Sequence, residues 1–202
     1  MKKLDFNPAN MDADTTYQLL TGCVMPRPIA WISTRSADGL LNLAPFSFFN
    51  IASSDPPTLA ISISEPDDAS KGKKDTLRNI EETGELVVNV VSEELVDQMN
   101  STGAEFPYGV NEFDVAGLHT EESLSVSVPR IAEAKASMEC KLRQIIPIGA
   151  DHLVLAEVVR FVVREDVVAD GKIQPEKMKV VGRMAGPRFT KTNEIFMRQI
   201  PS

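Results

Sequence analysis

The sequence has 202 residues, of which 43% are hydrophobic, and its 29 acidic and 21 basic residues give a net charge of −8. A chain of this length can bury roughly 70% of the surface that it exposes when unfolded, so neither a metal nor a disulfide is needed to hold it together. We predict a single domain over residues 1–202. Because an acidic surface repels nucleic acid and anionic lipid, we expect neither as a partner and predict a small-molecule ligand.

The N-terminus and the cysteines indicate a reducing, cytoplasmic location. The first ten residues, MKKLDFNPAN, lack the apolar core of a signal peptide. No apolar run approaches the length of about 18 residues that would span a bilayer. Cys23 and Cys140 lie far apart in the sequence and form no Cys-x-x-Cys pair.

Short runs rich in Val and Ile, several of them alternating apolar with polar residues, dominate the chain and are typical of β-strands. Asp38-Gly39, between apolar runs, is a strong hairpin signal. Pro56 and Pro57 mark a turn, because proline cannot donate to a strand ladder. The predicted strands lie in residues 28–34, 36–50 after the Asp38-Gly39 turn, 58–64, 85–91, 137–148 and 152–165.

Two helices are expected among these strands. In residues 74–84 the apolar positions share a face, Asp75 or Thr76 is expected to cap the first turn, and Gly84 occupies the position of a left-handed C-terminal residue. Residues 92–103 show a second apolar stripe after a capping serine.

The balance of elements predicts the fold class. Strands greatly outnumber helices, and no alternation of strand and helix is visible, so we predict a mainly β protein, an antiparallel barrel with peripheral helices. Residues 102–118 are expected to form a long irregular excursion. His119 and His152 belong to separate segments without metal-ligand spacing, so we predict no metal site.

Residues 70–80, SKGKKDTLRNI, concentrate positive charge in an otherwise acidic chain. A helix N-terminus offers unpaired N–H groups and roughly half a positive charge, so Thr76, the neighbouring amides and a lysine could hold a phosphate there. A solvated lysine loop with an ordinary helix cap is the alternative. Residues 42–50, NLAPFSFFN, mix aromatic rings with short hydrogen-bonding groups, which suits a flat heteroaromatic ligand, or else forms an aromatic core strand.

Six segments follow one another along the chain: RPIAWIST (27–34), NLAPFSFFN (42–50), DPPTLAISI (55–63), KDTLRNIEETGELVVNV (74–90), VPRIAEAKASMECKL (128–142) and GRMAGPRF (182–189). Taken together and in this order, they resemble the flavin reductase-like family of FMN-binding split barrels. The resemblance runs from about Arg27 to the C-terminus and implies a Greek-key split β-barrel, usually a homodimer with FMN near the subunit interface.

The resemblance also implies a set of cofactor-binding residues, while no catalytic residue is assigned. The segment of residues 42–50 would lie along the isoalloxazine ring, and the segment that begins at Lys74 would hold the phosphate and the ribityl chain. The ring contacts implied are Ala44, Pro45, Ser47, Phe48 and Phe49, with Asn42 assisting. The phosphate and ribityl contacts implied are Lys74, Asp75, Thr76 and Asn79, with Lys71 nearby. Further candidates are Ser33, Thr34, Ser62 and Ser64 for the ribityl chain or the pyrimidine edge, and Arg183 in the last segment, where Phe189 stands at the family's usual tyrosine.

The activity implied is the reduction of flavin by NADH or NADPH, with hydride passing from nicotinamide C4 to flavin N5. This chemistry mainly requires that two rings be held in contact, which agrees with a sequence that shows no familiar catalytic motif. One alternative is an FMN electron carrier of the flavoredoxin type, which exchanges electrons with a partner protein and has no nicotinamide site. Another is a non-enzymatic small-barrel binding module, which the acidic charge disfavours as a nucleic-acid binder.

Overall fold

The structure is a computed structural model that describes residues 1–66, 72–192 and 194–199. Its centre is a seven-stranded antiparallel sheet with the strand order β2-β1-β5-β8-β9-β4-β3. The strands are β1 (Ala30–Arg35), β2 (Leu41–Phe46), β3 (Phe49–Ser54), β4 (Pro57–Ser64), β5 (Glu85–Val90), β8 (Ala136–Ile148) and β9 (Asp151–Val163). The predicted strands are confirmed, with one correction: β3 is a separate strand that runs beyond residue 50.

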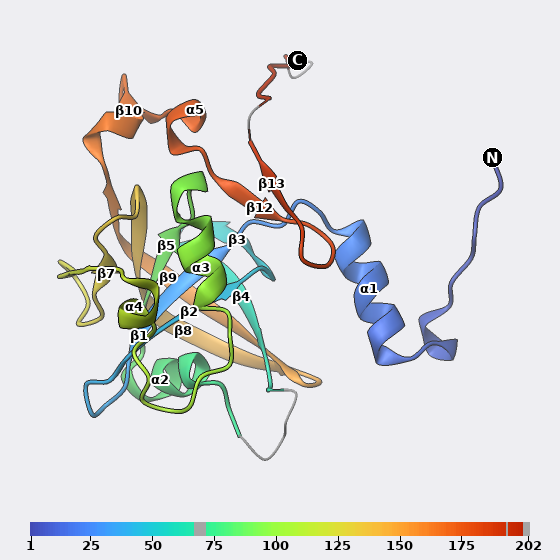
Figure 1. Cartoon of the computed structure of the whole chain (residues 1–202), viewed down its shortest axis with the longest axis horizontal. Helices are drawn as coiled ribbons and strands as arrows, with labels where there is room; N and C mark the ends of the chain where they lie inside the picture. Colours follow the sequence, from blue (N-terminus) through green and yellow to red (C-terminus); the bar gives the residue numbers. More distant parts are fainter. Residues whose placement is uncertain (67–71, 193, 200–202) are drawn as a thin grey trace.

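The sheet curves until its two edge strands meet at a corner. β2 and β3 stand at opposite ends of the strand order, yet only Ser47 and Phe48 separate them in the chain. The Ser62 amide donates to the Phe48 carbonyl over 2.8 Å, which attaches this corner to β4. The molecule is therefore a split β-barrel, and the predicted mainly β class is confirmed (Figure 1).

Alternation along the strands divides the apolar residues between two clusters. Ala30 and Ile32 of β1 face the barrel interior, whereas Trp31 between them faces outward, because neighbouring residues of a strand point to opposite faces. Helix α2 (Asp75–Thr83) covers the interior cluster with two fully buried residues, Leu77 and Ile80. The outward cluster around Trp31 is covered by α3 (Val96–Ser101) and α4 (Glu112–Ala116).

The expected helices are present, with differences at their ends. Residues 92–103 form a 3-10 turn, η3 (Glu93–Leu95), followed by α3. Gly84 ends α2 at φ 70°, as predicted. The predicted cap of α2 is wrong: Lys74 occupies the N-cap position, and no side chain of the described residues caps the first turn. Residues 102–118 are not wholly irregular, because they contain α4.

The remaining elements lie around the barrel. They are η1 (Pro8–Asn10), α1 (Ala13–Cys23), β6 (Thr120–Glu121), β7 (Arg130–Ile131), η4 (Glu165–Val167), β10 (Val168–Ala169), β11 (Lys172–Ile173), α5 (Pro175–Met178), β12 (Val181–Arg183) and β13 (Phe189–Lys191). In the part of the chain that the structure describes, no helix is long and apolar enough to cross a membrane.

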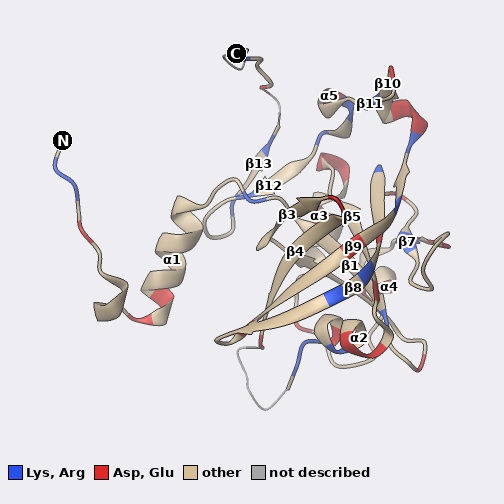
Figure 2. Ribbon diagram, turned by 180° about the vertical axis from the view of Figure 1, so that it is seen from behind, with Lys and Arg blue, Asp and Glu red and all other residues tan. Residues whose placement is uncertain are grey.

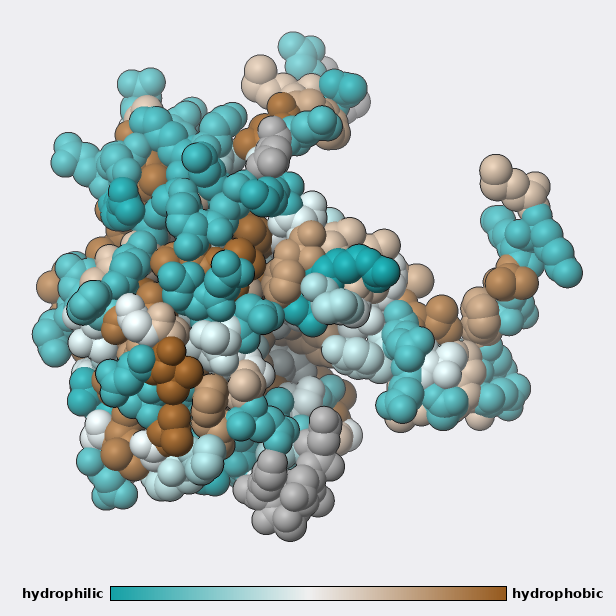
Figure 3. Space-filling model, in the orientation of Figure 1, coloured by the Kyte–Doolittle hydropathy of each residue, from teal (hydrophilic) through white to brown (hydrophobic). Residues whose placement is uncertain are grey.

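Helix α1 stands off the barrel, and the residues before it reach still farther away (Figures 1 and 3). The β12–β13 hairpin lies beside the C-terminal end of this helix in both ribbon views (Figures 1 and 2), although the two are far apart in the sequence. Arg27, just after α1, joins them. Its backbone N–H and C=O each bond to Arg183 over 2.9 Å.

Candidate functional site

A cavity of about 530 Å³ lies between β2, the start of α2 and the segment of residues 102–108. This volume is within the range of about 300–1,000 Å³ that small-molecule sites occupy. Apolar and polar groups both line it, including Phe46, Phe106 and Tyr108. Six of the residues named from the sequence line this cavity: Asn42, Ala44, Pro45, Lys74, Asp75 and Thr76.

The polar wall of this first cavity is a chain of buried amides and hydroxyls. The Asn42 side-chain amide donates to Thr76 Oγ1 over 2.9 Å and to Thr34 Oγ1 over 3.3 Å. The Asn79 amide donates to the same Thr34 hydroxyl over 3.0 Å. Thr34 and Asn79 therefore lie behind the cavity wall, where they fix the positions of Asn42 and Thr76.

The start of α2 is open to the cavity. The first bond inside the helix runs from the Arg78 amide to the Lys74 carbonyl, so the amides of Asp75, Thr76 and Leu77 have no partner within the helix. With no side-chain cap from the part of the chain that the structure describes, these donors and the positive end of the helix dipole face the cavity as a place for an anion.

The basic side chains of this segment differ in what they contact. Lys73 Nζ bonds to both Glu81 carboxylate oxygens, at 2.6 and 2.7 Å. Arg78 pairs with Asp75 over 2.8 Å. Lys74 is exposed and lines the cavity, and it forms no ion pair with any residue that the structure describes. Lys71 lies outside the described residues.

Glu112 also lines the first cavity and was not identified from the sequence. Its carboxylate is buried and accepts a hydrogen bond from the Leu43 amide over 2.9 Å, which satisfies a donor of the edge strand β2. Burial raises the pKa of this carboxyl group above its ordinary value, and the nearby charge of Asp75 raises it further. The contact joins residues 69 positions apart, so no local pattern announces it.

A second cavity, of about 420 Å³, adjoins the first. Both cavities are lined by Pro45, Phe46 and Gly103, and the second continues toward α1 and the β12–β13 hairpin. Two residues named from the sequence, Ser47 and Arg183, lie here and not in the first cavity.

The other named residues that the structure describes do not line either cavity. The ring centre of Phe48 lies 6.2 Å from that of Tyr17, which lines the second cavity. Phe49 packs against the barrel core. On β4, Ser62 is half-buried and Ser64 is exposed. We therefore leave Phe49, Ser62 and Ser64 out of the proposed site.

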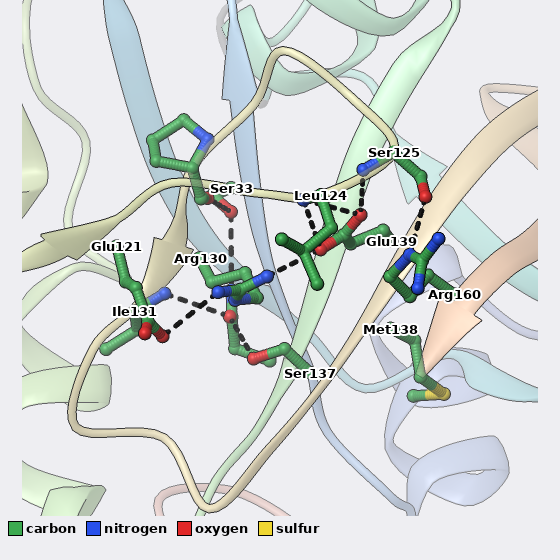
Figure 4. A network of polar contacts seen from close by, with 12 residues as sticks. Ser33, Glu121, Leu124, Ser125, Arg130, Ile131, Ser137, Met138, Glu139 and Arg160 are labelled. Atoms are coloured by element: carbon green, nitrogen blue, oxygen red, sulfur yellow. Dashed lines mark hydrogen bonds and ion pairs between the residues drawn. The ribbon is translucent and has the colours of Figure 1, made fainter. Parts of the chain in front are cut away.

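Ser33 faces away from both cavities, because Thr34 beside it on β1 points toward Asn42 and successive side chains alternate. Its hydroxyl donates to the Pro129 carbonyl over 2.7 Å. Figure 4 shows Ser33 in a polar network on this far side of the sheet, within which Arg130 pairs with the fully buried Glu139 over 2.6 Å. Ser33 therefore anchors the segment before β7, and we leave it out of the proposed site.

A split barrel with a cavity between an edge strand and an uncapped helix start defines a small-molecule-binding barrel protein. The family model described as "Flavin reductase like domain" matches residues 21–176, and the chain belongs to this family. An uncharacterized protein of Aquifex aeolicus (strain VF5) is 45% identical over 189 residues, which are 93% of this chain and 95% of that protein.

Solved structures agree with this assignment. Nitrilotriacetate monooxygenase component B from Bacillus cereus superposes with a TM-score of 0.93 at 37% identity, covering 98% of this chain and 100% of that one. The 2-nitrobenzoate 2-nitroreductase NbaA of Pseudomonas fluorescens gives 0.89 at 31% identity, covering 98% and 97%. The protein is accordingly a flavin-related oxidoreductase with a flavin cofactor, and the family predicted from the six sequence segments is confirmed.

Proposed function

We propose that the protein binds FMN in the first cavity and reduces it with NADH or NADPH. The observation that carries the proposal is the start of α2, where amides without a partner inside the helix meet Lys74, which pairs with no described residue, in a cavity of suitable volume. This donor set fits a phosphate monoester, since a helix N-terminus and a lysine both favour an anion.

The chain would hold the two ends of FMN with different chemistry. The phosphate would lie against the α2 amides, Lys74 and the Thr76 hydroxyl, which Asn42 orients from behind. The ring would lie along Ala44 and Pro45 of β2, whose backbone is held in place by Glu112. Aromatic residues of the cavity would exclude water from the ring.

Bound flavin would supply the redox chemistry, as the acceptor of a hydride from the nicotinamide and of a proton from solvent. The protein residues would bind and orient both molecules. Proximity is the larger part of this task, because it turns a collision of two molecules into a step within one complex.

A titration of apo-protein with FMN tests the phosphate site. Lys74→Ala removes one charge-assisted contact worth about 1.5–3 kcal/mol, so FMN binding should weaken about 10- to 150-fold. Flavin fluorescence quenching gives the dissociation constant. Riboflavin, which lacks the phosphate, should bind the parent more weakly and should be nearly indifferent to this substitution.

Two comparisons make this test decisive. Lys172→Ala removes an equal charge from an exposed position on β11 and should leave FMN affinity unchanged. Thr76→Ala should weaken FMN binding as well, and its unfolding curve must be measured beside it because the hydroxyl also bonds to Asn42. Equal losses of FMN and riboflavin affinity in Lys74→Ala would refute the phosphate assignment.

Two further proposals concern partners. Apolar side chains exposed on α1 favour a homodimer in which a second copy covers this helix.

NbaA is named for the reduction of 2-nitrobenzoate. Two arginines in the second cavity favour an anionic aromatic molecule as a reaction partner of the flavin here too.

A further inference from the structure

The two adjoining cavities differ in their charge. The first is lined by three basic and three acidic residues: Lys73, Lys74, Arg78, Asp75, Glu105 and Glu112. Among the described residues that line the second cavity, the charged ones are Arg27 and Arg183, and none is a carboxylate. In a protein with a net charge of −8, this concentration of positive charge favours an anion.

Arg27 builds the walls of the second cavity. It is only 5% exposed, and its Nη1 donates to the carbonyls of Thr21 and Val24 at the end of α1, over 2.9 and 2.8 Å. Its Nη2 donates to the Met184 carbonyl over 3.1 Å, and its Nε to Ser47 Oγ over 3.3 Å. One side chain thereby ties together α1, the β2–β3 corner and the C-terminal hairpin.

Arg183 is positioned but not neutralised. Its guanidinium lies 4.7 Å from the ring centre of Phe189, the residue opposite it across the β12–β13 hairpin. Stacking on an aromatic face holds a guanidinium in place. Its N–H donors, which lie in the plane of the guanidinium, still point outward and can bind a ligand. Within the described part of the chain, the guanidinium has no ion pair or hydrogen bond, so these donors are available to a ligand.

The hairpin that carries Arg183 is fixed tightly against the chain before β1. A Cβ atom added at Gly182 would lie 2.9 Å from Pro26 Cβ and 3.2 Å from Thr190 Cγ2, so only glycine permits this approach. Arg183 therefore has a defined place relative to Pro45 and Phe46, which line both cavities.

We infer that the second cavity binds the molecule that exchanges electrons with the flavin, and that Arg183 is the residue that recognises an anionic group on it. The ligand class is a flat ring that bears an anion: the ring would lie near Pro45, where the cavities join, and the anion at Arg183. A nicotinamide dinucleotide supplies such an anion as pyrophosphate, and an aromatic acid supplies it as carboxylate. This inference rests on the proposed flavin position in the first cavity.

Equilibrium binding to the protein loaded with oxidised FMN tests the inference without turnover. Calorimetric titrations with NAD⁺, benzoate and the neutral benzamide would be compared for the parent, Arg183→Gln and Arg188→Gln. Arg188 is the matched control, because it is exposed on the same hairpin and does not line the cavity. FMN affinity and thermal unfolding would be measured for each variant.

We expect NAD⁺, benzoate or both to bind the parent, with benzamide binding more weakly than benzoate. Arg183→Gln should lower the affinity for whichever anion binds by about 10- to 100-fold. Arg183→Lys should restore part of that lost affinity. Binding of NAD⁺ alone identifies the dinucleotide as the source of the anion, and binding of benzoate alone identifies an aromatic acid. Arg188→Gln should change neither affinity, and FMN affinity should be the same in all variants.

Three results would overturn the inference. They are a parent that binds neither anion, equal losses in Arg183→Gln and Arg188→Gln, and a loss of FMN affinity in Arg183→Gln, which would assign this arginine to the flavin. Failure of the proposed function is a separate result, because it would appear as a parent that does not bind FMN, and the anion titrations can be repeated on the apo-protein.

Discussion

Glu112 supports the edge strand β2 at the site, although its surroundings disfavour the charged form of its carboxyl group. Its carboxylate accepts a bond from the Leu43 amide, yet it is buried and lies near the negative charge of Asp75. Both effects disfavour the charged form and raise the pKa above the ordinary value of 4.5. The folded state therefore holds this proton more firmly than the unfolded state does.

The sign of the resulting pH dependence follows from linkage. The stability that Glu112 contributes is fully present below about pH 4.5 and is lost as the pH rises through the folded-state pKa. In Glu112→Gln this loss should not occur, because the amide oxygen can still accept from Leu43 and carries no charge. The variant should therefore gain stability relative to the parent as the pH rises from 4.5 to 8, measured by urea unfolding across this range.

The exposed Glu122 supplies the control for this measurement. Glu122→Gln should show no such trend relative to the parent. A Glu112→Gln variant whose stability relative to the parent is constant over the whole pH range would show that the carboxyl group has equal pKa values in the folded and unfolded states.

At this scale, local sequence patterns found some site residues and missed others for a physical reason. Lys74 and Thr76 were named because they begin a helix, and the structure brings both to the first cavity. Ser33 and Thr34 are adjacent polar residues on one strand, and only the register of β1 against β2 decides which of them faces Asn42. Glu112 reaches the site through a contact between distant segments, which a local pattern does not contain.

Among the elements, the strands were predictable because they are rich in β-branched residues and are bounded by turn residues. Helix α1 was missed although Asp12 caps it with a 2.6 Å bond to the Thr15 amide. Only Thr21 of this helix is buried, so α1 lacks the broad buried face of a core-facing helix, and its apolar residues Tyr17 and Leu20 are exposed. Helix α4 was missed because five residues are too few to display a helical period.

The same helix carries the prediction at the element scale. Tyr17 and Leu20 lie three positions apart on one face of α1, Val24 follows at its C-cap, and each of the three is more than half exposed in the single chain. We expect a second copy of the chain to cover this face. Leu20→Asp should weaken the homodimer about 10- to 150-fold, since burial of a leucine contributes about 1.5–3 kcal/mol, and sedimentation over a range of concentrations would measure the loss.

Gln18→Asp supplies the matched comparison, because it adds the same charge to a different face of α1 and should leave the dimer intact. A parent that sediments as a monomer at every concentration while binding FMN would contradict the proposal. Equal weakening by both substitutions would assign the effect to charge or to loss of the helix instead of to this face.

For the molecule as a whole, the fold followed from six segments that keep the family's order, whereas the shape of the site did not. The cavities are formed where β2, α2, residues 102–108, α1 and the C-terminal hairpin meet. A local sequence pattern can indicate each of these elements separately. Which of them lie side by side depends on how the barrel closes, and no local pattern contains that information. The division of the site into a near-neutral and a positively charged cavity therefore became visible only in three dimensions.

This division bears on the source of the electrons, which is the last prediction. If NADH or NADPH is the donor, mixing either with the FMN-loaded protein without oxygen should bleach the visible flavin absorbance, because the two cavities meet at Pro45 and Phe46 and let two rings approach. Raising the salt concentration should raise the nicotinamide concentration needed for half-maximal rate, since the attraction to two arginines is screened.

Free FMN with the same nicotinamide measures the reaction without protein, and dithionite verifies that the bound flavin can be reduced. Bleaching by one nicotinamide well above the rate with free FMN would support the reductase and would identify the preferred donor. If neither nicotinamide reduces the flavin while a reduced carrier protein does, the protein is an electron carrier of the flavoredoxin type. In that case its partner must deliver electrons to a flavin held between β2 and α2, and the acidic surface of this chain favours a carrier with a basic docking face.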